Sequence, residues 1–424
     1  MTSKPPAKAR QIPTSRVGRI ARLAALSMSG GDARVRRTAE VLGTLRGLAA
    51  KVGQMASYVD GLVPEEHRDV YESSLCALRA HAAHSDTAAV RHLIEEELGA
   101  PIDQLFAEWN DTPFASASIG QVHRARLHDG HEIAVKVQHP EIAKAIESDL
   151  ANAGLVEAMI GALGGRRLDS KGLFEVAKTR FREELDYRHE AQSLLFFARL
   201  HAHDAKILVP GFIPSHSSAR VLSTELALGA TFETACGAPE ADRRAWAETL
   251  WRYVYRGSLV GGRFNADPHP GNYVFLENGT IVFLDYGCVQ AFAGDALSNA
   301  RKMHQAALLR DEAAFAKRVS VMVKARSGRL ENAARSYVRR CFEPLFESPF
   351  RVTRPYAGSL VTSLKDLALL ARSAKDDELF TMPPEMLFIN RLQFGFYSVL
   401  ARLDVNVDYA AVERSFAAEI PGGG

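Results

Sequence analysis

The sequence is poor in the features that mark several classes of protein. Its four cysteines, Cys76, Cys236, Cys288 and Cys341, are far apart and form no CxxC pair. A disulfide framework and a zinc cluster are therefore disfavoured, and a reducing compartment is expected. The formal net charge is only +2, and no basic run is interleaved with aromatic residues, which argues against a nucleic-acid-binding protein.

Long apolar runs are also missing. A membrane-spanning helix needs about 20 mostly apolar residues. The best candidate, LFINRLQFGFYSVLARL at 387–403, contains Asn390, Arg391, Gln393 and Arg402. We therefore reject it as a span. Any membrane contact should be peripheral, through amphipathic helices or a basic segment.

Acidic residues are absent from residues 1–31, which carry six lysines and arginines. A block of like charge is typical of a solvated, disordered tail. The alternatives are an electrostatic tether to anionic lipid and an organellar transit peptide. No long apolar core follows, so a secretory signal is disfavoured.

What the chain does contain is an ordinary globular composition, long enough at 424 residues for about three domains. Apolar residues recur in steps of three and four over 32–59, which predicts a helix closed by Gly61 and Pro64. A second helix is predicted over 86–98, ending at Gly99–Pro101.

Residues 113–140 change to the alternation that is typical of strands, and Asp129-Gly130 is a strong hairpin signal between them. The next predicted elements are a long helical region over about 171–203, a strand pair around 207–226 and a mainly helical region after 240. That region is broken by a loop–strand–turn–strand segment at 264–290, with its turn at Asn278-Gly279, and helices are predicted from 291 onward.

The segment 264–290, FNADPHPGNYVFLENGTIVFLDYGCVQ, sets two carboxylates and an amide among turn and strand formers. Asp267 is followed five residues later by Asn272, and Asp285 with its Tyr-Gly follows after thirteen more. Kinase-type phosphoryl transfer uses this order of aspartate, asparagine and aspartate–aromatic–glycine. A turn with capping carboxylates is the alternative, but the three-part spacing favours a site for metal and phosphate.

Magnesium takes few, hard oxygen ligands and lets substrate phosphates complete its shell. We therefore predict that Asn272 and Asp285 bind Mg²⁺ or Mn²⁺, with ATP or ADP as the nucleotide. Asp267 is predicted to orient or deprotonate the acceptor.

A kinase-type site also needs a strand lysine with a carboxylate partner. Lys136 in IAVKV is predicted to bind phosphates, and Glu190 is chosen as its partner over Glu184 and Asp186 on the same predicted helix. The small-residue stretch FASASIGQVHRA lies where a phosphate-covering loop would be. The nucleotide contacts assigned in addition are Ala115, Ser116, Ala117, Ser118, Gly120 and Glu225.

With these motifs in view, the chain resembles the UbiB/AarF-type atypical kinases, the aarF-domain-containing family linked to ubiquinone biosynthesis, over residues 40–410. LRGLAAKVGQMAS resembles the family's KxGQ signature, EELDYRHEA its ExD motif, and ASASIGQVHRA its alanine-rich loop. NADPHPGN and LDYG resemble its catalytic and metal loops, and MPPEMLFINR its C-terminal helix. The KxGQ residues are Lys51, Gly53 and Gln54, and those of ExD are Glu184 and Asp186.

The resemblance implies an α+β, two-lobed protein-kinase-like fold with a helical N-terminal extension and a mostly helical C-lobe. The expected parts are a basic tail over 1–31, a helical extension over 32–110, an N-lobe over 111–230 and a C-lobe over 231–424. It further implies that the KxGQ helix crosses the active site and blocks protein substrates, with Lys51 paired to Glu184. Lys51, Glu184 and Asp186 thereby join the predicted catalytic set.

Three positions depart from the family pattern. Asn265 replaces a histidine two residues before Asp267, which we expect to affect loop packing more than chemistry. Tyr286 replaces a phenylalanine, and Ser116 interrupts the alanine run, which leaves the choice between ATP and ADP open.

The resulting hypothesis is an atypical kinase or ATPase that acts on a small lipid-like molecule and supports ubiquinone or related isoprenoid-lipid metabolism. The rivals are a Ser/Thr protein kinase and a nucleotide-switched, non-catalytic lipid-binding scaffold. The expected partners are adenine nucleotide, a lipid or quinone precursor and an anionic membrane surface, without nucleic acid, and a homodimer is left open. The expected location is cytoplasmic and peripheral at the inner membrane, or mitochondrial in a eukaryote.

Overall fold

The computed structural model describes residues 85–117, 119–150, 182–292, 294–323, 328–373 and 385–421. These residues divide into two compact units, which are described separately: the first holds the described residues of 85–191 and 211–226, and the second those of 192–210 and 227–421. Several predictions lie outside the described residues, namely those for the basic tail, the helix over 32–59, the KxGQ residues Lys51, Gly53 and Gln54, residues 171–181 and Ser118.

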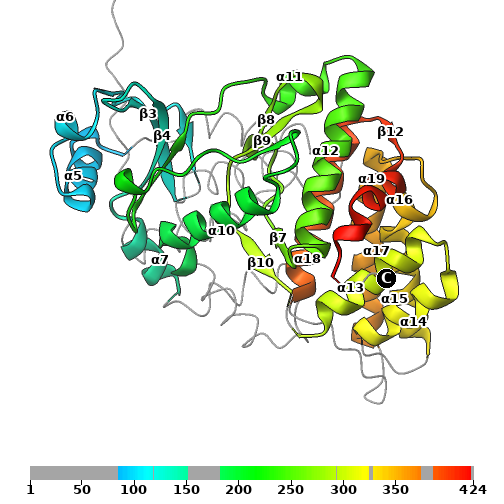
Figure 1. Ribbon diagram of the computed structural model, residues 1–424. Helices are drawn as coiled ribbons and strands as arrows, with labels where there is room; N and C mark the ends of the chain where they lie inside the picture. Colours follow the sequence, from blue (N-terminus) through cyan, green and yellow to red (C-terminus); the bar gives the residue numbers. More distant parts are fainter. Residues whose placement is uncertain are drawn as a thin grey trace, which may run out of the picture. The chain divides into compact units, whose positions relative to one another are not determined.

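The first unit is built on an antiparallel sheet with the strand order β1-β3-β4-β6, and β2 pairs with β3 (Figure 1). The central hairpin joins β3 and β4 through a turn in which Gly130 has φ 91°, so the predicted hairpin is confirmed. The strands are β1 (Glu108–Trp109), β2 (Ala115–Ser116), β3 (Gly120–Arg126), β4 (Glu132–Gln138) and β6 (Val221–Glu225).

The two faces of this sheet are covered by different elements. On one face, Val135 and Val137 are fully buried against α5 (Thr87–Leu98) and α6 (Ile102–Leu105). The predicted helix over 86–98 is confirmed, because the Asp86 side chain accepts a hydrogen bond from the Ala89 N–H and Gly99 ends the helix in the left-handed conformation.

The opposite face of the sheet carries Lys136, which pairs with Val122 and Leu222 in the strand register. Leu222 packs there with residues of α7 (Ile142–Leu150) and with Tyr187 and Ala191 of α10 (Tyr187–Leu200). Side chains alternate between the faces of a strand, so the apolar residues on either side of Lys136 along β4 anchor the strand while Lys136 points away from that core.

Gly120, at the start of β3, lies too close to its neighbours for any side chain. A Cβ atom there would clash with the Val137 carbonyl oxygen and lie 2.8 Å from the Tyr187 hydroxyl oxygen. The glycine of the predicted phosphate loop is therefore required by packing against β4 and α10, independently of any ligand.

The predicted helical region over 171–203 is confirmed in its described part, but it is interrupted by a turn. The chain turns at Leu185–Asp186, and α10 begins only at Tyr187. The Asp186 carboxylate accepts a hydrogen bond from the Arg188 N–H at 3.0 Å. In a continuous helix, the Arg188 N–H would donate to a carbonyl of the preceding turn. Here the Asp186 side chain accepts that hydrogen bond instead.

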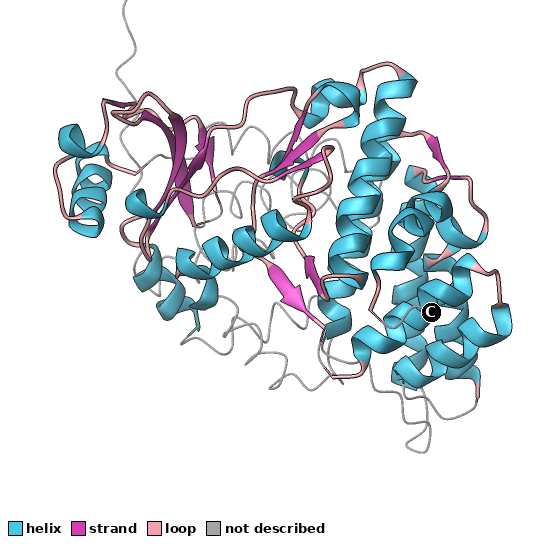
Figure 2. Cartoon of the chain, viewed as in Figure 1, coloured by secondary structure: helices cyan, strands magenta, loops and turns pink. Residues whose placement is uncertain are grey.

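In its described residues, the second unit contains a large helical region with a short two-stranded sheet inside it, and two further small sheets (Figure 2). In one sheet β5 (Ile207–Leu208) and β8 (Tyr273–Phe275) flank β9 (Ile281–Phe283), and in the other β7 (Arg263–Asn265) pairs with β10 (Val289–Ala291). The predicted turn is confirmed, since Asn278 and Gly279 have φ values of 56° and 74°.

The predicted strand pair within 207–226 is confirmed in part, because Phe212 forms an antiparallel bridge with Thr224 of β6, whereas β5 itself pairs elsewhere. β5 pairs in parallel with β9, whereas β6 belongs to the sheet of the first unit. Pro210 and Pro214 cannot donate to a strand ladder and lie on either side of the short bridging segment around Phe212.

Helices dominate the rest of the second unit. The prediction of helices only from 291 onward is wrong at β11 (Phe350–Arg351) and β12 (Asn406–Val407), which pair with each other. The helices are α11 (Phe232–Cys236), α12 (Glu240–Leu259), α13 (Ala296–Leu308), α14 (Glu312–Val323), α15 (Arg329–Cys341), α16 (Glu343–Phe346), α17 (Arg354–Ser373), α18 (Glu385–Leu403) and α19 (Tyr409–Phe416).

Among the described residues we find no helix whose length and apolar content would let it cross a bilayer. The rejected segment at 387–403 is part of α18. From Phe394 to Leu403 this helix is buried mainly through its apolar residues in the second unit, which explains its high apolar content.

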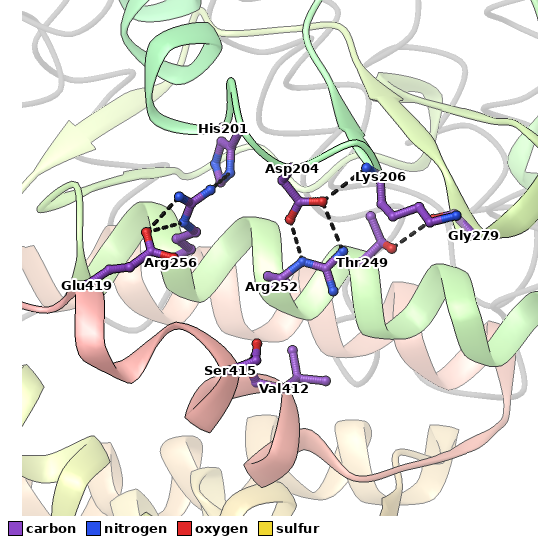
Figure 3. A network of polar contacts seen from close by, with 10 residues as sticks. All are labelled: His201, Asp204, Lys206, Thr249, Arg252, Arg256, Gly279, Val412, Ser415 and Glu419. Atoms are coloured by element: carbon purple, nitrogen blue, oxygen red, sulfur yellow. Dashed lines mark hydrogen bonds and ion pairs between the residues drawn. The ribbon is translucent and has the colours of Figure 1, made fainter.

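Two arginines of α12 anchor distant parts of the second unit (Figure 3). Arg252 binds Asp204, just beyond α10, while the Arg256 guanidinium donates twice to Glu419 Oε2, at 2.9 and 2.6 Å. Arg256 Nη1 also lies 3.4 Å from His201 Nδ1. Burial, reinforced by the charge of Arg256, lowers the pKa of the His201 imidazole to about 3.

This histidine predicts an acid-sensitive fold. Unfolding exposes His201, whose imidazole then binds a proton below its ordinary pKa of 6.5, whereas the folded protein binds it only near pH 3. The free energy of unfolding should therefore fall by about 1.4 kcal/mol for each pH unit below 6.5 through this residue alone. His201→Phe keeps a ring between Phe197 and Tyr253 and should remove that part of the slope. Urea denaturation between pH 7 and pH 5 measures this pH dependence of the free energy of unfolding. His203→Phe, on the exposed turn, is the control. Equal slopes for wild type and His201→Phe would contradict the assignment.

Candidate functional site

The first unit holds the predicted lysine–glutamate pair. Lys136 Nζ lies 2.8 Å from Glu190 Oε1 and 2.9 Å from Oε2, so the choice of Glu190 as the partner is confirmed. The side chains are 16% and 5% exposed, and the ammonium group is therefore fixed rather than free in solvent. Binding of nucleotide phosphates by this pair stays a prediction.

Tyr187 is a part of this arrangement that the sequence analysis missed. Its ring centroid lies 5.2 Å from Lys136 Nζ, which places the cation over the aromatic face. Tyr187 is three residues before Glu190 on α10, so both side chains lie on one side of the helix. The sequence signal that could have identified Tyr187 was its position three residues before Glu190, the residue chosen as the partner of Lys136.

The small-residue loop folds back on β3. Ala115 and Ser116 form the edge strand β2, and the Ala117 N–H donates to the Gly120 carbonyl at 2.9 Å. Ala115 and Ser116 are exposed residues, and their contact with phosphate stays a prediction.

Glu225 receives no support from the sheet geometry. It pairs with Ile133, so its side chain lies on the face opposite Lys136. Its carboxylate accepts a hydrogen bond from the Gly211 N–H at 3.0 Å. Glu184 and Asp186 are partly exposed near the start of α10, and the predicted ion pair of Glu184 with Lys51 involves a residue outside the described part of the chain.

The second unit brings together Asp267, Asn272 and Asp285. The Asn272 carbonyl accepts a hydrogen bond from the Leu284 N–H at 3.0 Å, at the end of the β8–β9 pairing, which places Asn272 beside the backbone that leads into Asp285. The Asn272 side-chain Nδ2 donates to the Asp267 carbonyl at 3.1 Å. The predicted hairpin thus gathers the three residues in one set of hydrogen-bonded loops.

Asn265 ties these loops together. Its Oδ1 accepts a hydrogen bond from the Asp267 N–H at 3.0 Å, and its Nδ2 donates to the Asp285 carbonyl oxygen. One side chain therefore fixes the backbone of both aspartates, which agrees with the expected effect on loop packing.

Tyr286 anchors the loop of Asp285 in the core of the second unit. Its side chain is fully buried and its ring centroid lies 5.4 Å from that of Phe197. Burial raises the pKa of the Tyr286 phenol, so the residue stays neutral. The Asp285 Oδ1 accepts a hydrogen bond from the Gly287 N–H at 2.9 Å, which sets the orientation of the carboxylate.

These side chains fit a hard divalent cation. Because Asn272 uses its Nδ2 as a donor to Asp267, its amide oxygen is the atom left to bind a metal. One amide oxygen and one oriented carboxylate are the kind of oxygen ligands that Mg²⁺ or Mn²⁺ takes when phosphates and water complete the shell.

Asp267 is held by a residue to which the sequence analysis gave no role in the site. Arg391 of α18 lies 124 positions further along the chain, and its Nη2 is 2.8 Å from Asp267 Oδ1. The two side chains are 9% and 15% exposed. The pair is therefore a largely buried ion pair within the second unit.

Comparison with known proteins agrees with this reading of the motifs. Residues 77–319 match the model of the ABC1 atypical kinase-like domain. The chain belongs to this family. As a member of the ABC1 family it has a kinase-like fold, which confirms the predicted fold class and the predicted resemblance.

The relatives of this ABC1 protein include kinases from animals and fungi. It is 30% identical over 313 residues to "Atypical kinase COQ8B, mitochondrial" from Rattus norvegicus, covering 67% of this chain and 58% of that protein. It is 33% identical to "AarF domain-containing protein kinase 1" from Mus musculus, covering 60% and 49% of the two chains. It is 28% identical to "Atypical kinase COQ8, mitochondrial" from Saccharomyces cerevisiae, covering 72% and 65%. The chain thus spans between about half and two thirds of the length of these relatives.

A solved structure shows the same fold. The Mycobacterium tuberculosis protein Rv3197, determined in complex with erythromycin, superposes with a TM-score of 0.61 and 24% sequence identity. The match covers 96% of this chain and 99% of the other. At this identity the likeness concerns the fold of the ABC1 protein alone.

Proposed function

We propose that this ABC1-family protein binds adenine nucleotide with Mg²⁺ or Mn²⁺ and either hydrolyses it or transfers its terminal phosphoryl group to a small lipid-like molecule. The observation that carries the proposal is the convergence of Asp267, Asn272 and Asp285 in loops bonded to one another. A bound metal ion would neutralise charge on the phosphates.

The residues of the chain then have distinct tasks. Asn272 and Asp285 would hold the metal, and Asp267 would orient the attacking oxygen or accept its proton. In the first unit, Lys136 would bind the α- and β-phosphates. Because Glu190 and Tyr187 already fix its ammonium group, little side-chain freedom remains to be lost on binding.

The lipid part of the proposal rests on the family. COQ8 relatives are named mitochondrial kinases, and the KxGQ and ExD motifs resemble those of kinases linked to ubiquinone biosynthesis. We propose that the acceptor or activator is an isoprenoid-quinone precursor or a related lipid at an anionic membrane surface. The division into tail, extension, N-lobe and C-lobe, the Lys51–Glu184 pair and the blocked peptide cleft are proposed with it.

A phosphate-release assay tests this function. The full chain is incubated with Mg²⁺ and ATP, alone, with liposomes that contain an anionic lipid, and with a phenolic mimic of a quinone precursor. We expect Mg²⁺-dependent release that rises with at least one addition and is lost in Lys136→Met. Nucleotide that stabilises the fold by about 2.7 kcal/mol at a hundredfold excess over Kd, with no release under any condition, would contradict an enzyme and favour a scaffold. Phosphate found on protein rather than on the small molecule would favour a Ser/Thr kinase.

A further inference from the structure

Four polar residues in the largely apolar helix α18, namely Asn390, Arg391, Gln393 and Arg402, each have a defined partner in the second unit. The Asn390 side chain accepts a hydrogen bond from the Tyr337 hydroxyl at 2.9 Å, and Gln393 Nε2 donates to the Cys341 carbonyl at 3.1 Å. Arg402 stacks its guanidinium over the ring of Phe232 at 4.6 Å. The remaining polar residue, Arg391, binds Asp267.

The position of Arg391 is fixed from both sides along the helix. Asn390 and Gln393, its neighbours, both bind α15, and the Tyr397 hydroxyl also donates to the Cys341 carbonyl, at 2.8 Å. The apolar side chains of α18 from Phe394 to Leu403 are mostly buried. The helix is therefore anchored on both sides of Arg391, which fixes the position of the guanidinium.

At the other end of this side chain are the groups of the candidate site. Arg391 Nη2 lies 2.8 Å from Asp267 Oδ1, and Nη1 lies 3.4 Å from Cys288 Sγ, three residues after Asp285. The Cys288 carbonyl in turn accepts a hydrogen bond from the Ala266 N–H at 2.9 Å. A single guanidinium thus contacts the loop of each predicted aspartate.

We propose that Arg391 is a positioning residue for Asp267. It fixes the orientation of the carboxylate, because a charge-assisted hydrogen bond between two largely buried side chains is short and directional. The inference rests on the proposed phosphoryl-transfer function and deepens it. It makes turnover depend on α18, a helix that is 118 residues or more beyond Asp267 in the chain.

A double-mutant cycle with Asp267 tests this role. We expect Arg391→Met to lower kcat by about a hundredfold, because misplacement of a reacting group by about 1 Å costs that much. The KM for nucleotide should change by less than about twofold, because the binding groups remain. In an Asp267→Asn background the same Arg391→Met change should have almost no further effect on kcat. Arg391→Lys, which keeps the charge, should recover part of the lost rate.

The matched control is Arg402→Met, which removes an arginine from the same helix away from these loops and should leave kcat unchanged. Folding of every variant is checked by circular dichroism and by Tm, and the Arg391→Lys variant keeps the test valid if Arg391→Met unfolds. A loss of rate of equal size in both Asp267 backgrounds would show a merely structural role and overturn the inference. Wild-type turnover in Arg391→Met would overturn it as well. No turnover by the wild-type protein with any acceptor would instead overturn the proposed function, and the inference with it.

Discussion

Asp285→Asn should lower metal-dependent nucleotide turnover by about a thousandfold or more, since a metal ion contributes several kcal/mol to the transition state and each 1.36 kcal/mol is tenfold in rate. The substitution keeps the size of the side chain and its acceptor for the Gly287 N–H. It removes the negative charge that a divalent cation requires. The fold should therefore persist while metal binding is lost.

The measurement is turnover as a function of Mg²⁺ concentration. The variant should need far more Mg²⁺ for any residual activity, and its affinity for nucleotide should no longer respond to the metal. Asp295→Asn, at an exposed position ten residues further along the same unit, is the matched control and should behave as wild type. An Asp285→Asn variant with the wild-type Mg²⁺ dependence would show that the cation is held elsewhere.

Asp267→Asn should lower kcat by about 10²–10⁴, the usual size of general-base assistance, while nucleotide still stabilises the fold. The Asn265 and Asn272 contacts to Asp267 involve its backbone and should remain. Single-turnover kinetics separates this effect from product release, and nucleotide-induced shifts in Tm report binding. Unchanged turnover would remove Asp267 from the catalytic set.

The same variant should also be less stable. Asn in place of Asp267 leaves the guanidinium of Arg391 buried without its counter-charge, and breaking a buried pair costs about 3–5 kcal/mol. Adding Arg391→Met removes this unpaired buried charge. The double variant should therefore recover part of the lost free energy of unfolding. This recovery separates the structural cost of the pair from the catalytic loss, which should persist.

The parts of the fold that the sequence predicted depend on local signals. Asp86 and Gly99 delimit α5, and Asp129-Gly130 and Asn278-Gly279 form the turns expected of them, because capping and turn chemistry act over a few residues. The Lys136–Glu190 pair was predictable because strand alternation and helix periodicity limited the choice to a few carboxylates. We could likewise predict that Asp267, Asn272 and Asp285 lie together, because a hairpin joins them in the sequence.

The parts that were missed depend on contacts between distant segments. The pairing of β5 with β9 joins residues more than seventy positions apart, and no local pattern specifies it. The start of α10 at Tyr187 is set by the Asp186 side chain, which competes with the backbone for a hydrogen bond. In the sequence, Arg391 stood out as a charge that excludes a membrane span and as part of the motif MPPEMLFINR, without a role in the site. Its partner, Asp267, is 124 positions away, so the ion pair becomes apparent only in the folded chain.

The most direct test of the account is a crystal structure of the full chain with Mg²⁺ and a non-hydrolysable ATP analogue. The account predicts a metal ion bound by the Asn272 amide oxygen and the Asp285 carboxylate, with phosphate oxygens completing its shell and also contacting Lys136 Nζ. Asp267 should remain on Arg391 in that complex. A nucleotide bound away from these groups, or a metal ion without Asn272 and Asp285 among its ligands, would contradict it.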